Sequence, residues 1–147
     1  MRRYIPGLHS GQQDLVSNLD GLFLVRVERA SYRWHPQKPY FSLRFSILEP
    51  ASHEAISFSG RLYCTNRALW KLSWFLRDFG YDAELLARDQ VDERALLNLR
   101  GVVRTSFTNH NGHSYQNLDA FASAAEWEAL SSDVAKKDDT GETQDAL

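Results

Sequence analysis

Strict alternation of apolar and polar residues constrains the fold of this chain more than any other feature. Residues 21–28 and 40–47 both alternate, with Phe23, Val25 and Val27 as the apolar positions of the first stretch. Successive side chains of a β-strand point to opposite faces of the sheet. The period of two therefore predicts two strands with one face buried and the other in solvent.

A third alternating stretch, residues 56–63, predicts a third strand, after which the period changes. Residues 65–79 have apolar residues at helical spacing, which predicts a helix with one buried face. We expect Thr65 or Asn66 to cap its start and Gly80 to end it. The apolar face consists of Leu69, Leu72, Phe75 and Leu76.

The second half of the chain predicts a weaker helical region followed by a hairpin. Residues 82–98 are rich in charged residues. The apolar side chains expected to contact the core are Leu85, Leu86, Val91, Leu96 and Leu97. Strands are predicted at 99–108 and 114–121, joined by the loop 109–113, whose Asn-Gly pair is a strong hairpin signal. Residues 122–130 could form one last short helix.

This order of elements predicts a mainly β domain with a helical insert, in the α+β class. Three strands, a helix and two more strands is the order of the OB-fold, a five-stranded and partly open barrel. A small α+β sheet of another topology is the alternative. We expect an N-terminal arm or short edge element at 1–20, the OB-fold-like domain at 21–130 and a disordered acidic tail at 131–147.

Composition and charge narrow the class of protein. With 43% apolar residues the 147-residue chain can form a core, and no apolar run is long enough to span a membrane. The single cysteine, Cys64, favours a reduced, cytoplasmic protein. The net charge of −2 is unevenly distributed along the chain. Residues 21–118 include 13 basic and nine acidic residues, whereas residues 119–147 include two basic and eight acidic residues. Such segregation is common in proteins that handle nucleic acid.

Binding of a single nucleic-acid strand needs cations for the phosphates and flat rings for the bases. In an OB-fold the second and third strands and the first-second and fourth-fifth loops form the ligand surface. The candidate positions on the strands are Arg26, Tyr40, Arg44, Arg61, Tyr63 and Arg104. The candidates in the loops and closing hairpin are Tyr32, Arg33, Trp34, Lys38, His110 and Tyr115. The alternative is that these are ordinary solvent-facing strand residues.

The tryptophans allow two roles each. Trp34, in a loop flanked by prolines, is either a stacking platform or a plug that closes one end of the barrel. Trp70 and Trp74 are four residues apart on the predicted helix, which favours the core or a partner-binding face over nucleic-acid contact.

Motifs for chemistry are lacking in this sequence. It has no phosphate-binding loop, nucleophile elbow or zinc-protease motif, and we expect no catalytic residue and no cofactor. His110 and His113 alone are weak evidence for a metal site, and none is predicted. We expect Cys64, at the end of an apolar strand, to be an inert thiol.

Residues 21–27 and 40–49, continuing to Phe107, resemble a diffuse group of phage and mobile-element OB-fold proteins. Those proteins are described as single-stranded-DNA-binding-like or as domains of unknown function. The resemblance covers about residues 20–121 and rests on element order and apolar pattern. It implies an OB-fold, and the acidic segment is similar in kind to the tails of bacterial single-stranded DNA-binding proteins.

The leading hypothesis is therefore sequence-independent binding of single-stranded DNA, or of RNA, during replication, recombination or transposition of a mobile element. The rival is a non-catalytic, OB-like interaction subunit of a larger nucleoprotein assembly. Its protein partners would bind through the helix face or the acidic tail. Self-association into a homo-oligomer is left open by the sequence.

Overall fold

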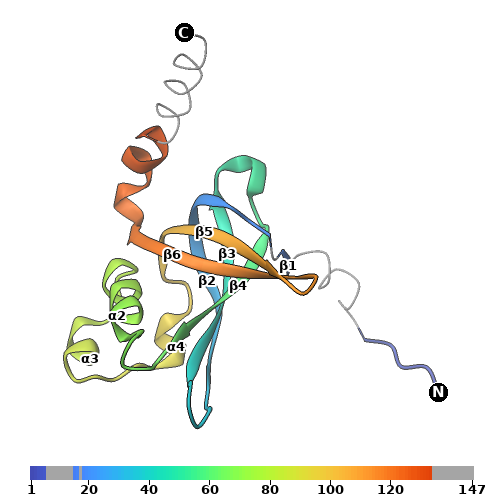
Figure 1. The fold of residues 1–147 in the computed structure, drawn as a ribbon. Helices are drawn as coiled ribbons and strands as arrows, with labels where there is room; N and C mark the ends of the chain where they lie inside the picture. Colours follow the sequence, from blue (N-terminus) through green and yellow to red (C-terminus); the bar gives the residue numbers. More distant parts are fainter. Residues whose placement is uncertain (6–14, 17, 134–147) are drawn as a thin grey trace.

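The alternating stretches form the strands of one sheet in the computed structural model, which describes residues 1–5, 15–16 and 18–133 (Figure 1). The spatial order is β1-β4-β3-β2-β5-β6. The five strands β2 to β6 are antiparallel to their neighbours, and β1 is parallel to β4. The strands are β1 (Leu15–Val16), β2 (Gly21–Arg33), β3 (Tyr40–Glu49), β4 (Ser57–Tyr63), β5 (Arg100–His110) and β6 (His113–Ser123).

The helices are short and lie mainly between β4 and β5. They are η1 (Ala51–His53), α2 (Leu69–Asp78), α3 (Ala83–Ala87), α4 (Glu93–Leu96) and η2 (Ala124–Glu126), the last followed by helical residues 127–133. The predicted mainly β architecture, with helices between the third and fourth long strands, is confirmed. A closed barrel is not formed: within the described residues no ladder joins β4 to β6.

β2 is longer than predicted and contains a bulge. Its register against β3 shifts between Val27 and Arg29, which leaves Glu28 as the extra residue. The strand continues to Arg33, so Tyr32, predicted in a loop, pairs with Phe41. The connecting loop is reduced to residues 34–39.

The β5–β6 hairpin is confirmed and its loop is shorter than predicted. Asn111 and Gly112 both have positive φ, 52° and 78°, as a two-residue type I′ turn requires. The ladder continues to the pair His110 and His113, which flank this turn.

Helix α2 begins later than predicted and ends as predicted. The expected cap by Thr65 or Asn66 is wrong, because the first helical residue is Leu69 and its N-cap, Ala68, forms no side-chain cap hydrogen bond. The backbone carbonyl of Thr65 instead accepts from the N–H groups of Ala68 and Leu69, at 2.9 and 3.0 Å. At the other end Gly80 has a φ of 79°, a left-handed conformation that suits glycine.

The charged region after Gly80 forms two short helices, each with an aspartate at its N-cap. The Asp82 side chain accepts from the N–H groups of Glu84 and Leu85, and that of Asp92 accepts from the N–H of Arg94. Leu96 is fully buried as predicted. The expected apolar contact from Leu97 is wrong, since that side chain points outward and is 42% exposed.

The two ends of the domain differ from the predicted boundaries. Leu19 is buried in the core, so the domain begins before residue 21. At the other end β6 continues to Ser123, and residues 131–133 are helical although the disordered tail was predicted from 131. The rest of that predicted tail, and residues 6–14 and 17 of the predicted arm, lie outside the described residues.

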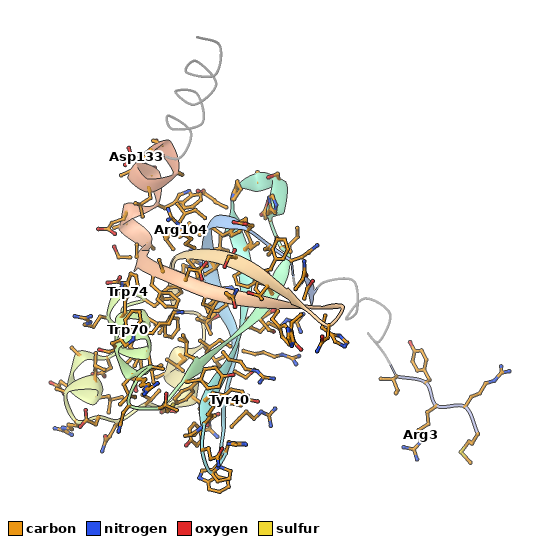
Figure 2. The ribbon with its side chains drawn as sticks, viewed as in Figure 1. Arg3, Tyr40, Trp70, Trp74, Arg104 and Asp133 are labelled. Atoms are coloured by element: carbon orange, nitrogen blue, oxygen red, sulfur yellow. The ribbon has the colours of Figure 1, made fainter. Side chains whose placement is uncertain are left out.

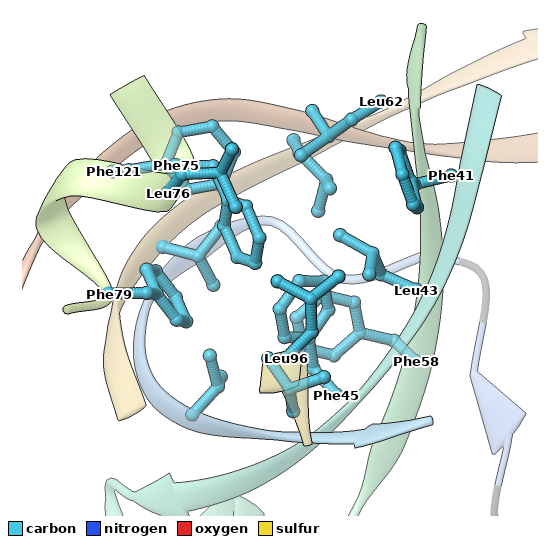
Figure 3. Packing of buried hydrophobic residues seen from close by; sticks show 14 of the residues in the cluster. Phe41, Leu43, Phe45, Phe58, Leu62, Phe75, Leu76, Phe79, Leu96 and Phe121 are labelled. Atoms are coloured by element: carbon cyan, nitrogen blue, oxygen red, sulfur yellow. The ribbon is translucent and has the colours of Figure 1, made fainter. Parts of the chain in front are cut away.

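The core lies between the inner face of the sheet and α2 (Figure 3). Phe45 of β3 is at its centre, with ring centroids 5.3 Å from Phe58, 6.2 Å from Phe75 and 6.1 Å from Phe79. Phe121 of β6 joins the same cluster through its contacts with the two α2-side rings, Phe75 and Phe79. The helix therefore packs against β3 and β6, which β2 and β5 separate in the sheet.

One glycine allows β4 and β6 to approach without a ladder. A Cβ added at Gly60 of β4 would lie 2.6 Å from Cγ of Leu118 of β6, closer than real Cβ contacts allow. Both residues are buried. The two sheet ends thus meet by side-chain packing, and we call this line of contact the seam.

Gly60→Ala should destabilise the protein because the added methyl overlaps Leu118 across the seam. We expect the free energy of unfolding in urea to fall by roughly 1–3 kcal/mol. Leu118→Ala supplies the space that this methyl needs, so the double variant should lose less than the sum of the two single losses. Strictly additive losses would show that the two residues do not contact.

Candidate nucleic-acid interface

The sheet brings most of the strand candidates to one outer face. Arg33, Tyr40 and Tyr63 are opposite one another on β2, β3 and β4. Arg61 is two residues from Tyr63 along β4, on the same face, and is paired with Ser42. The guanidinium carbon of Arg61 lies 4.6 Å from the centroid of the Tyr40 ring. The Tyr40 and Tyr63 rings are 5.6 Å apart and tilted by 55°. Cations and aromatic rings are therefore neighbours on this face. Tyr40, Arg61 and Tyr63 lie on strands as predicted, whereas Arg33, predicted in the first loop, is the last residue of β2.

Arg44 shares this face, but its charge is already paired. Its Nε lies 2.9 Å from Oε2 of Glu28, the bulge residue, and both side chains are half-buried. Among the described residues that Nε has no hydrogen-bond partner, so the contact is an ion pair without hydrogen-bond alignment. Ser57 Oγ donates to the same Glu28 oxygen at 3.1 Å. Arg44 is thus less available to a phosphate than the exposed Arg61.

Three of the predicted residues are separated from this cluster. Arg26 donates through Nη1 to Oδ1 of Asn98 at 2.9 Å. Arg104 is on β5, paired with Leu22 and Ala120, and Figure 2 shows it far from Tyr40.

Tyr32 is the third, because it is on the inner side of the β2–β3 hairpin. Its ring packs against Phe41, with centroids 5.3 Å apart. The bulge at Glu28 explains the difference, since the extra residue changes which side chains of β2 point inward.

Both hairpins present their candidate residues to solvent. Trp34 is 74% exposed in the 34–39 loop, and Lys38 is exposed in the same loop. The alternative that Trp34 plugs a barrel is therefore wrong. On the β5–β6 hairpin, His110 and Tyr115 are exposed.

An open groove of about 750 Å³ runs between β4, β6 and the start of α2. Its walls contain three cations and three aromatic rings, and none of the described residues that line it is acidic. These six residues are Arg61, Arg67, Lys71, Tyr63, Trp70 and Tyr115. We call it the basic groove; it follows the seam and adjoins the outer face at Arg61 and Tyr63.

Three of the six groove residues were not predicted as nucleic-acid contacts. Arg67, Trp70 and Lys71 belong to the turn before α2 and its first turn. Their spacing of three and four residues places them on one side of a helix, and this signal was available in the sequence. That these residues lie across the groove from Tyr115 of β6 depends on tertiary packing, which the local sequence does not determine.

The predicted partner-binding pair, Trp70 and Trp74, divides between surface and core. Their rings stack with centroids 6.1 Å apart, but Trp70 is 61% exposed and lines the basic groove. Trp74 is partly buried, contacts Phe121 edge to face and donates through Nε1 to Oδ2 of Asp78 at 2.7 Å. The exposed ring of Trp70 therefore stacks on Trp74, which is itself packed against the core.

Groups capable of other chemistry are sparse in the described part of the chain. No cluster of three His, Cys, Asp or Glu side chains that could hold a metal ion occurs among the described residues. Cys64 is half-buried, and its burial raises the pKa of the thiol, which keeps it protonated at neutral pH. No helix within the described ranges is long and apolar enough to cross a membrane.

Comparison with known proteins gives no family for this chain. No protein-family model matches the sequence, and no curated protein matches it.

Trp34→Ala should leave the stability of the protein nearly unchanged, because the exposed indole buries little surface that truncation could remove. We expect the free energy of unfolding in urea to change by no more than about 0.5 kcal/mol. The matched control is Trp74→Ala, which removes a ring packed on the core and should cost roughly 3–5 kcal/mol. A large loss for Trp34→Ala would mean that the indole packs against the domain.

Proposed function

We propose that this protein binds single-stranded nucleic acid along the basic groove and the adjoining outer face, without sequence preference and without performing chemistry. The observation that carries the proposal is the groove lining, which combines three cations with three aromatic rings and includes no acid among its described residues. Cations neutralise phosphates and rings stack on bases of any sequence. The ligand class that we propose is single-stranded DNA, and RNA is the second arm of the test.

The proposed fold is OB-like. The strand order β4-β3-β2-β5-β6, with α2 between β4 and β5, is the order expected of an OB-fold whose third and fifth strands do not pair. In such a fold the ligand crosses the second and third strands between two loops. Here those loops would be 34–39, which contains Trp34, and the turn of the β5–β6 hairpin, and we propose that both extend the binding surface. We further propose a role in replication, recombination or transposition of a mobile element, on the resemblance described above.

The direct test is a fluorescence polarisation titration of the full chain with labelled oligo-dT and oligo-rU at two salt concentrations. A nucleic-acid interface should lose affinity steeply with salt, because binding releases counterions. Tighter binding of oligo-dT than of oligo-rU would show that DNA is the preferred ligand. No binding to either oligonucleotide, at low salt as well, would overturn the proposal and favour the rival role as an interaction subunit, in which the exposed Trp70 docks on a protein.

The groove cations should determine the salt dependence. Arg61→Ala combined with Arg67→Ala removes two exposed charges from the groove, and the slope of log K against log salt should flatten by roughly 1.4 for a single strand. The control variant, Arg88→Ala with Arg94→Ala, removes two exposed charges from the α3–α4 region outside the groove. Equal effects of the two double variants would show that only net charge matters and that the groove is not the site.

Trp70 should supply stacking. Trp70→Ala is expected to cost roughly 1–3 kcal/mol of binding free energy, independent of base sequence, and to remove part of the tryptophan quench on adding oligonucleotide. The thermal unfolding midpoint should change little, because this ring is mostly exposed. Unaltered affinity with an unaltered quench would exclude Trp70 from the interface.

A further inference from the structure

A second concave surface lies on the other side of α2. This cleft, of about 820 Å³, is between α2, the α3–α4 region and the inner side of the β2–β3 hairpin. Its apolar wall includes Tyr32, Leu69, Leu72 and Val91. Leu69 is 44% exposed and Tyr32 is 40% exposed, so part of this apolar wall faces solvent. The surface is thus an apolar recess that none of the described residues covers.

The rim of this cleft carries charge of the opposite sign to the basic groove. Asp89 and Glu93 line it and are exposed, and none of the described lining residues is basic. A ligand that fits must bring apolar side chains for the wall and positive charge for the rim. The two carboxylates would repel the phosphates of a nucleic-acid strand. The cleft therefore fits a peptide with adjacent apolar and basic residues.

The chain contains such a segment in residues 1–5, Met-Arg-Arg-Tyr-Ile. The structure describes this segment away from the domain, with Tyr4 90% exposed and Ile5 57% exposed. Figure 1 shows it on the side of β1, opposite to α2 and α3. Two large apolar side chains next to two arginines therefore project from the molecule without contacting its own cleft.

We infer that residues 1–5 of one copy dock in the α2 cleft of a second copy. Tyr4 and Ile5 would bury their side chains against Leu69 and Tyr32, and Arg2 and Arg3 would pair with Asp89 and Glu93. Because each copy has one arm and one cleft on opposite sides, the exchange can be reciprocal and close a dimer, or continue from copy to copy. The inference goes beyond the proposed function and does not require that nucleic acid binds.

Sedimentation velocity of the full chain over a dilution series tests the arm and the cleft separately. We expect reversible, concentration-dependent association. Tyr4→Ser with Ile5→Ser, and Leu69→Asp alone, should each raise the dissociation constant by roughly tenfold or more, since each removes buried apolar area from the contact. Leu97→Asp is the matched control, because Leu97 is 42% exposed and lies outside the cleft; it should leave association unchanged.

Charge exchange tests the predicted pairing. Arg3→Glu and Glu93→Lys should each weaken association, and the two together should restore it, which a nonspecific contact would not do. In addition, a labelled peptide with the sequence of residues 1–7 should bind the Tyr4→Ser, Ile5→Ser chain and fail to bind when Leu69→Asp is added.

Three results would overturn the inference. The first is that the protein sediments with the mass of a single chain at every concentration. An arm docked in its own cleft would give this result too. The second is association that Leu69→Asp and Leu97→Asp affect equally. The third is a peptide that binds equally well with and without Leu69→Asp. Circular dichroism confirms that each variant is folded before it is compared.

Discussion

The aromatic cluster around Phe45 is the interaction on which the rest of the structure depends. Phe58 of β4 stacks on Phe45, and Phe75 and Phe79 bring α2 against the same ring. Phe121 of β6 packs on both of these helix-side rings, although three strands separate β6 from β4 in the sheet. Each such pair contributes about 0.5–1.5 kcal/mol beyond the burial of its area. Since no described ladder joins β4 to β6, these rings, with the Gly60–Leu118 contact, set the distance between the sheet ends.

That distance in turn defines the basic groove. Its walls come from β4, β6 and the start of α2, which are separated in the sequence and approach only because α2 packs across the open side of the sheet. The same packing directs one side of α2, with Trp70 and Lys71, to the groove and the other, with Leu69 and Leu72, to the second cleft. One helix thus forms a wall of two surfaces with different chemistry.

The sequence predicted the elements well where a simple period applies. Alternation located β2, β3 and β4, and Asn111-Gly112 located the β5–β6 turn, because the side-chain period and the positive φ of the turn are local properties. The candidate site was predicted in part: Arg33, Tyr40, Arg61 and Tyr63 do share one face, as register dictates once the strands are placed.

The errors arise where a contact with a residue distant in the sequence determines the direction or the pairing of a side chain. The bulge at Glu28 moved Tyr32 to the inner side, and the ion pair with Glu28 made Arg44 different from Arg61. Leu96 and Leu97 were both predicted to pack, but only Leu96 is in the core, since the single turn of α4 directs one of the two neighbours inward. Arg67 and Lys71 were overlooked because their partner across the groove, Tyr115, is more than forty residues away in the chain.

The opposite charges on the two sides of α2 give the molecule a directional property that its net charge does not reveal. Arg61, Arg67 and Lys71 line one side, and Asp89 and Glu93 line the other. The separation is local, because Arg88 and Arg94 of the α3–α4 region are exposed next to those two acidic residues in the sequence. A polyanion would be attracted at the side of Trp70 and repelled within the cleft at the side of Leu69. The two sides of one helix therefore present opposite local potentials in a chain whose net charge is only −2.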